Sequence, residues 1–147
     1  MDCQIEVTKS AQPADLAAVQ GGLARHNQDY VGPVAGVVAV LLRDDTGVVA
    51  GGAVGPMFLR EGCERECFLD WMWVRADLRG QRYGSRLLAA AEASAAEQGC
   101  RRMTLNTFSF QALEFYRKQG YTPLVTIPDF MVGYDKIYLR KALTPNV

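Results

Sequence analysis

The chain has 147 residues, of which 49% are hydrophobic and 22% are charged, a composition typical of one globular domain. Its 16 basic and 16 acidic residues cancel, so no overall positive field would draw it to nucleic acid. The longest apolar stretch, Val31 to Leu42, is too short to cross a bilayer as a helix. The chain begins without a basic, apolar leader, so we expect a cytoplasmic protein with one domain over residues 1–147 and no membrane partner.

The four cysteines are Cys3, Cys63, Cys67 and Cys100, and in a cytoplasmic chain free thiols are more common than disulfides. Cys63 and Cys67 are spaced closely enough to suggest part of a metal site. However, His26 is the sole histidine in the sequence, and no second close pair of cysteines occurs. We therefore expect no structural metal.

The N-terminal part of the sequence predicts a strand, a helix and then a hairpin. Alternating polar and apolar residues predict a short strand over Gln4–Thr8. Apolar residues at helical spacing predict a helix from Pro13 to about Arg25. Val-rich segments predict strands over Val34–Arg43 and Val48–Phe58, joined by a turn at Asp44–Gly47.

The C-terminal part alternates strands with helices. Gly99 and Gly120 are expected to end two helices, and Ser109 is expected to cap the start of the second one. The hairpins precede a strand–helix–strand crossover, which indicates an α/β (α+β) fold with a mixed sheet flanked by helices. The remaining expected elements are strands over 67–74, 102–107, 121–127 and 134–143 and helices over 84–98 and 109–119.

The turn between the third apolar strand and the long helix carries a local excess of positive charge. Between residues 75 and 86, Asp77 is the one acidic residue facing four arginines, Arg75, Arg79, Arg82 and Arg86. Because the first amides of a helix are unpaired and carry its positive dipole end, this turn predicts a phosphate or pyrophosphate site. The alternative is an ordinary strand-to-helix turn with surface arginines. The glycine patterns of nucleotide P-loops and dinucleotide folds do not occur here.

Two separate motifs resemble those of the GNAT N-acetyltransferase superfamily. The run Val74–Gly84 resembles its acetyl-CoA-binding motif. In that motif a strand ends in Val, four residues follow, and then comes the pattern Arg/Gln-x-x-Gly-x-Gly/Ala. Arg79 and the final glycine match, whereas Arg82 stands at the usual middle glycine. The run Ser109–Tyr121 resembles the family pattern Asn-x-x-Ala-x-x-x-Tyr-x-x-x-Gly-Phe, with Ser for Asn and Tyr for Phe.

With the order of elements, this resemblance covers nearly the whole chain. It implies a mixed, mostly antiparallel central sheet of six or seven strands, flanked by three or four helices and splayed at the fourth and fifth strands. It also implies acetyl-CoA as co-substrate, with the pyrophosphate on the turn and the pantetheine arm along the preceding strand. The implied cofactor-binding residues are Met72, Val74, Arg79, Gly80, Gln81, Arg82, Tyr83, Gly84, Ser85 and Ser109. For Ser109, a plain helix cap is an equal alternative.

Two side chains are candidates for proton transfer. The resemblance implies Tyr116 as the general acid, since a phenol can protonate a leaving thiolate of comparable basicity, and the alternative is a core aromatic residue. Asp70 is a candidate base or amine-binding group because a carboxylate inside an apolar strand must be paired, desolvated or functional. We expect it to share a strand face with Met72 and Val74. Its alternative is a structural hydrogen bond, and Glu66 ranks below it.

The acceptor pocket is the least specified part of the site. The resemblance implies that His26, Asn27 and Phe130 line it, although a lone histidine just past a helix is more often a C-terminal cap. Asp129 and Tyr134 are similar candidates. The aromatic residues Phe68, Trp71, Phe110 and Phe130 near this pocket would suit a partly apolar or cationic acceptor.

The resulting hypothesis is transfer of an acetyl group from acetyl-CoA to a primary amine of a small molecule, by direct attack in a ternary complex. Cys100 lies at the start of a strand beyond the long helix, so an acyl-cysteine route is not expected. Many relatives are dimers, so a homodimer is expected by resemblance. The alternatives are a protein lysine or N-terminal acetyltransferase and a non-catalytic module that binds acyl-CoA.

Overall fold

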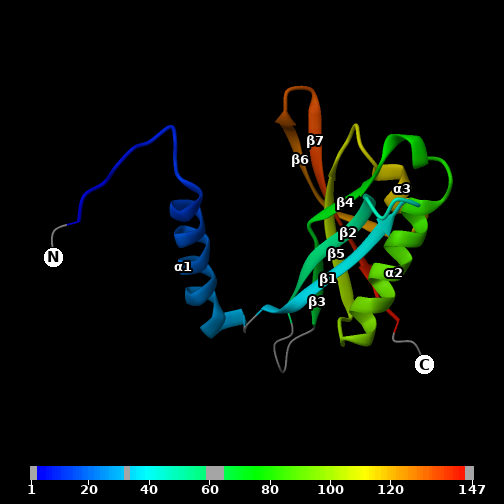
Figure 1. The fold of residues 1–147 in the computed structure, drawn as a ribbon, viewed down its shortest axis with the longest axis horizontal. Coiled ribbons are helices and arrows are strands. Elements are labelled where there is room, and N and C mark those ends of the chain that lie inside the picture. The colour runs from blue at the N-terminus through cyan, green and yellow to red at the C-terminus, as the bar shows by residue number, and fades with distance from the viewer. Residues whose placement is uncertain (1–2, 32–33, 59–64, 145–147) are drawn as a thin grey trace. The chain divides into compact units, whose positions relative to one another are not determined.

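The computed structural model describes residues 3–31, 34–58 and 65–144, and the chain forms two compact units, Met1–Gly32 and Pro33–Val147 (Figure 1). Within the described residues, no helix is long and apolar enough to cross a membrane.

The smaller unit is built on helix α1, Pro13–Val31, which is longer than the predicted Pro13–Arg25. His26 therefore lies inside the helix, and the expectation that it follows the helix end is wrong. The predicted strand at Gln4–Thr8 is also wrong, because these residues are exposed and form no regular structure. Alternation alone does not make a strand: its backbone groups need a partner, and no described strand pairs with this segment.

The larger unit contains a seven-stranded sheet in the order β1-β2-β3-β5-β7-β6, with β4 paired to β2 beside this path. The β3–β5 pair is parallel, and every other pair is antiparallel. The predicted mixed, mostly antiparallel sheet is confirmed. The strands are β1 Val34–Arg43, β2 Val49–Phe58, β3 Glu66–Leu69, β4 Trp71–Val74, β5 Arg102–Phe108, β6 Thr122–Met131 and β7 Tyr134–Ala142.

Among the described residues of this unit, two helices and a short 3-10 turn accompany the sheet: η1 Ala76–Leu78, α2 Tyr83–Glu97 and α3 Leu113–Lys118. Figure 1 shows α2 and α3 on the same side of the sheet. The apolar face of α2 (Leu87, Leu88, Ala91 and Ala95) packs with strand residues into one buried core. Gly99 and Gly120 have φ values of 96° and 93°, which confirms that they end helices in a left-handed conformation.

The predicted strand over residues 67–74 is interrupted at Asp70. Cys67 of β3 pairs with Met57, but Trp71 of β4 pairs with Val54, so three residues on this side oppose two on β2. This extra residue is a β-bulge, and it reverses the alternation of side chains. As a result Asp70 is exposed and does not continue the face of Met72 and Val74 as predicted.

Gly55 on β2 lies directly opposite the bulge. A Cβ atom placed there would clash with the carbonyl oxygen of Phe68 and would lie 2.8 Å from Leu69 Cα. Only glycine allows β2 and the bulged strand to approach this closely. The bulge is therefore set by a contact between residues far apart in sequence.

The start of α3 differs from the prediction as well. Ser109 does not cap the helix: its Oγ accepts a hydrogen bond from the Asp135 amide at 3.0 Å. Thr107 Oγ1 instead accepts from the Ala112 amide at 3.3 Å, and Gln111 Oε1 accepts from the Phe108 amide at 3.0 Å. The loop before α3 is thus held to β5 and β7, and the helix begins four residues later than expected.

Candidate active site

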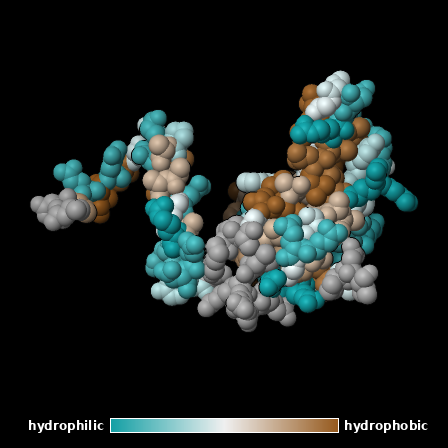
Figure 2. Space-filling model, turned by 60° about the horizontal axis from the view of Figure 1, so that its bottom comes forward, coloured by the Kyte–Doolittle hydropathy of each residue, from teal (hydrophilic) through white to brown (hydrophobic). Residues whose placement is uncertain are grey.

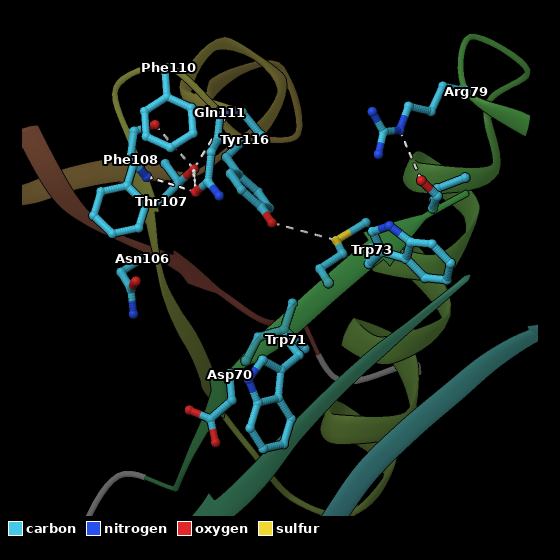
Figure 3. Close-up of a pocket in the computed structure, with 14 residues that line it drawn as sticks. Asp70, Trp71, Trp73, Arg79, Asn106, Thr107, Phe108, Phe110, Gln111 and Tyr116 are labelled. Atoms are coloured by element: carbon cyan, nitrogen blue, oxygen red, sulfur yellow. Dashed lines mark hydrogen bonds between the residues drawn. The ribbon is translucent and has the colours of Figure 1, made fainter. Parts of the chain in front are cut away.

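The bulge separates β4 from β5 and opens a cleft between them. The parallel β3–β5 pairing ends at Leu69 and Leu105, and beyond this point β4 pairs with β2 while β5 pairs with β7. This confirms the predicted splay. The cleft has a volume of about 820 Å³ (Figure 3). It is lined by Leu69, Asp70, Trp71, Met72, Trp73, Val74, Arg79, Asn106, Thr107, Phe108, Phe110, Gln111, Ala112 and Tyr116.

One edge of β4 offers main-chain groups to this cleft. The Arg75 amide donates to Ala50 on β2, and in an antiparallel pair alternate residues share this orientation. The intervening residues, Met72 and Val74, therefore direct their N–H and C=O groups away from β2. The Val74 carbonyl accepts a hydrogen bond from Arg79 Nε at 2.9 Å. No described strand pairs with this edge, so the Met72 main chain and the Val74 amide can bind an extended ligand.

The turn that leads from β4 into α2 is shaped by two residues in the left-handed region, Gly80 with φ 75° and Arg82 with φ 66°. The backbone amides of residues 81–85 donate to no acceptor in the described chain, since the first bond at the helix start comes from Arg86 to the Arg82 carbonyl. A row of unpaired amides at a helix N-terminus fits a phosphate group. The left-handed Arg82 costs about 1 kcal/mol relative to glycine.

The arginines around this turn have different roles. Arg75 is bound by two carboxylates, Asp44 at 2.8 Å and Asp77 at 2.7 Å. Its guanidinium lowers the pKa of Asp44 to about 2 and also lowers the pKa of Asp77. Arg75 therefore ties the β1–β2 turn to η1. In the described chain Arg79, Arg82 and Arg86 form no ion pair, so they supply the positive charge predicted at the turn.

Tyr116 places its hydroxyl in the middle of the cleft. The side chain is 7% exposed and extends from α3 toward β4, where its Oη lies 3.6 Å from Met72 Sδ (Figure 3). Burial raises the pKa of Tyr116, so the phenol keeps its proton at neutral pH. Tyr116 therefore packs in the core and also presents a proton donor to the cleft. Its position is compatible with both interpretations of the sequence, a general acid and a core aromatic residue.

Asp70 and Arg79 are the charged residues among those that line the cleft, and they come from opposite ends of β4. Asp70 is exposed at the bulge, yet partial removal of water from the carboxylate raises its pKa. The cleft thus has a negative end at Asp70 and a positive end at Arg79 and the amide-lined turn. This polarity suits a cation at one end and a phosphate at the other.

Other predicted residues lie elsewhere. Ser109 is not among the residues that line the cleft. Phe130 is on β6, with its ring centroid 6.0 Å from that of Phe108 at the cleft wall. Glu66 is held by Arg102 and Arg140 at 3.1 Å each, so it serves an ion-pair network on β3, β5 and β7. His26 and Asn27 belong to α1 in the smaller unit.

Asp129, Cys67 and Cys100 serve structural roles, whereas Cys3 is exposed. The Asp129 carboxylate accepts a hydrogen bond from the Gly133 amide at 2.9 Å within the β6–β7 hairpin. Cys67 and Cys100 are buried, and burial raises the pKa of the Cys67 thiol to about 12. Cys63 lies outside the described residues. Within the described part of the chain, no three His, Cys, Asp or Glu residues form a group that could hold a metal ion.

The sequence reasoning missed several cleft residues. Asn106 and Trp73 line the cleft, and Thr107 and Gln111 shape its wall at the start of α3. The amide side chain of Asn106, between Leu105 and the end of β5, was a usable signal. The role of Gln111 had no local signal, because it depends on a hydrogen bond to the end of β5.

An open sheet splayed beside an amide-lined turn, with a phenol and a carboxylate in the cleft, defines an acetyltransferase architecture. A family model, "Acetyltransferase (GNAT) family", matches residues 8–121. The chain belongs to this family, and it is an acyltransferase.

Individual relatives agree with this assignment. The chain is 38% identical over 108 residues to Blasticidin-S acetyltransferase from Streptomyces morookaense, covering 73% of this chain and 76% of that protein. A crystal structure of an acetyltransferase from Bacillus cereus has a TM-score of 0.74 and 27% identity, covering 94% of this chain and 98% of that one. An aminoglycoside 6'-N-acetyltransferase complexed with coenzyme A shares the fold, with a TM-score of 0.60, 19% identity and coverage of 83% and 80%.

Proposed function

We propose that this protein transfers the acetyl group of acetyl-CoA to the primary amine of a small molecule, by direct attack in a ternary complex. The observation that carries the proposal is the unpaired edge of β4, which runs from the amide-lined turn to the hydroxyl of Tyr116. We also propose that residues 1–147 act together as one acetyltransferase domain.

The turn and β4 would hold the co-substrate. The amides of residues 81–85 suit its pyrophosphate, with Arg79 and Arg82 adding positive charge. The Met72 main chain and the Val74 amide would hydrogen-bond the pantetheine amides as a neighbouring strand would. Ser109 is left out of this set because it is not among the residues that line the cleft. When bound, acetyl-CoA supplies a thioester as the acetyl donor.

Tyr116 would act as the general acid and Asp70 as the general base. As the amine nitrogen bonds to the acetyl carbon, the carbon–sulfur bond breaks, and Tyr116 donates its proton to the leaving sulfur. An amine with a lysine-like pKa is mostly protonated at pH 7, a penalty of roughly 4.6 kcal/mol. Asp70 would attract this ammonium group and accept its proton, directly or through water. The nitrogen loses its second proton to solvent as the amide forms, Asp70 releases its proton to solvent, and solvent restores the proton of Tyr116 after the thiol leaves.

The acceptor would be a small molecule because the cleft volume of about 820 Å³ lies in the range of sites that bind small molecules. The relative from Streptomyces morookaense is named for the small molecule blasticidin S, and a structural neighbour acts on aminoglycosides. Neither name identifies the acceptor of this chain. They support a search among small amines before peptides.

The test is release of thiol from acetyl-CoA by the purified protein with a panel of small amines. We expect amine-dependent release and a matching amide product by mass spectrometry. Tyr116→Phe should reduce turnover by about 100-fold, because it removes the proton donor and little packing. Binding of coenzyme A without amine-dependent release would instead support a non-catalytic binding module.

Tyr121→Phe is the matched control for Tyr116→Phe. It removes another buried phenol hydroxyl, one that donates to Glu92 at 3.0 Å outside the cleft lining. Its turnover should stay close to that of the unsubstituted protein. If both variants lose activity equally, the loss reflects disturbed packing and Tyr116 is not the acid.

A further inference from the structure

Besides Tyr116, four aromatic side chains line the walls of the cleft, and the proposed transfer chemistry uses none of these four. Trp71 and Trp73 lie on the β4 wall, and Phe108 and Phe110 lie at the β5 wall (Figure 3). Figure 2 shows hydrophobic side chains gathered on one face of the larger unit. Large exposed rings at a binding cleft cost solubility unless a ligand covers them.

The β5 wall is held in place before any ligand binds. The rings of Phe110 and Phe108 are stacked, with centroids 5.5 Å apart and planes 5° from parallel. Tyr134 packs edge-on against Phe110 at 4.6 Å. Phe110 nevertheless remains 53% exposed. A ring that is rigid and still exposed can bind a planar group with little loss of side-chain entropy.

Charges near this wall decide which part of an acceptor it can bind. Lys136 Nζ lies 4.6 Å from the ring centroid of Phe130 and 5.8 Å from that of Phe108. A second cation on Phe108 and Phe110 would be repelled by this ammonium group. Asp70 is the one carboxylate among the described residues that line the cleft, so it is the favourable place for an ammonium group.

We propose that the acceptor is a primary amine that carries an uncharged planar aromatic or heteroaromatic ring. The ring lies against Phe110 and Phe108 on the β5 wall, and the amine faces the sulfur that Tyr116 protonates, on the side of the cleft that leads to Asp70. The proposal rests on the proposed acetyl transfer, which it narrows to one class of acceptors.

The test compares acceptors that differ in ring planarity alone. We would measure kcat/KM by thiol release for 2-phenylethylamine and for 2-cyclohexylethylamine, which have the same amine spacing and similar size. Ring stacking should favour the planar acceptor by roughly tenfold. Equal kcat/KM values would overturn the inference and leave the acetyltransferase proposal intact. Acetylation of aliphatic polyamines but of neither ring amine would also overturn the inference alone, whereas no acetylation across the whole panel of small amines would defeat the proposed function itself.

Variants of Phe110 assign the preference to this wall. Phe110→Leu should lower the kcat/KM of the planar acceptor, so that the two kcat/KM values lie within about twofold of each other. Phe110→Trp should keep the preference for the planar acceptor. Val132→Ala, at the exposed tip of the β6–β7 hairpin, is the control and should change neither value. Circular dichroism and coenzyme A affinity would verify that each variant is folded. A preference that persists in folded Phe110→Leu would overturn the assignment.

Discussion

Gly55→Ala tests whether the bulge at Asp70 controls both stability and activity. The added Cβ would lie 2.8 Å from Leu69 Cα and from the carbonyl carbon of Phe68, and it would also meet the Phe68 oxygen. Because nonbonded carbons prefer at least about 3.5 Å, β2 and β3 would have to separate by roughly 0.7 Å or more. All three contacts are with backbone atoms, which cannot rotate away.

We expect Gly55→Ala to reduce the free energy of unfolding by about 3 kcal/mol, near the upper end for overpacked cores. This corresponds to a decrease in Tm of about 10 °C, measurable by thermal unfolding. A shift of this size at the bulge would also displace Asp70 and Met72, so acetyl transfer should decrease by about 100-fold.

Gly22→Ala is the matched control, since its Cβ would meet nothing nearer than Arg25 Nη2 at 4.0 Å. This variant should keep its activity and keep or slightly raise its Tm, because alanine favours the helix. A Gly55→Ala variant with unchanged Tm and turnover would refute the steric argument for the bulge.

Three further predictions concern the turn, the cleft and the β1–β2 hairpin. Arg82→Gly should raise Tm by a few degrees, because it relieves about 1 kcal/mol of strain in the left-handed backbone. Coenzyme A should still bind through the backbone amides. A lower Tm would contradict this prediction. Asp70 has a raised pKa, so wild-type turnover should rise as pH increases through that pKa. Asp70→Asn should flatten this pH profile in thiol-release assays from pH 5 to 8. An unchanged profile would exclude Asp70 from proton transfer. Arg75 lowers the pKa of Asp44 from 3.8 to about 2, so this carboxylate stabilises the fold above pH 3.8 and loses its effect as pH falls to about 2. The Tm difference between wild type and Asp44→Asn should therefore shrink between pH 7 and pH 2, and a constant difference would argue against the ion pair.

Local patterns predicted the features that depend on neighbours in sequence. The β1–β2 hairpin forms where expected because the Asp44 carboxylate binds the amides of Thr46 and Val48 within the same turn. Gly99 and Gly120 end helices because each adopts a left-handed backbone that other residues avoid. The family motifs placed Tyr116 and the turn in one site, since their spacing reflects a recurring strand–helix arrangement.

Partners distant in sequence decided the rest. The bulge at Asp70 forms because Gly55 on β2 lets the backbone of Phe68 come close. The alternation of polar and apolar residues does not predict this contact. Ser109 binds Asp135, which lies 26 residues away, so its local resemblance to a helix cap was misleading. Sequence by itself determined the family, the turn and the ends of α2 and α3 at Gly99 and Gly120, because those follow from motifs and backbone preferences within short segments. Tertiary structure alone decided where β4 separates from β5 and which side chains enter the cleft, because both depend on packing between strands that meet only in the folded chain.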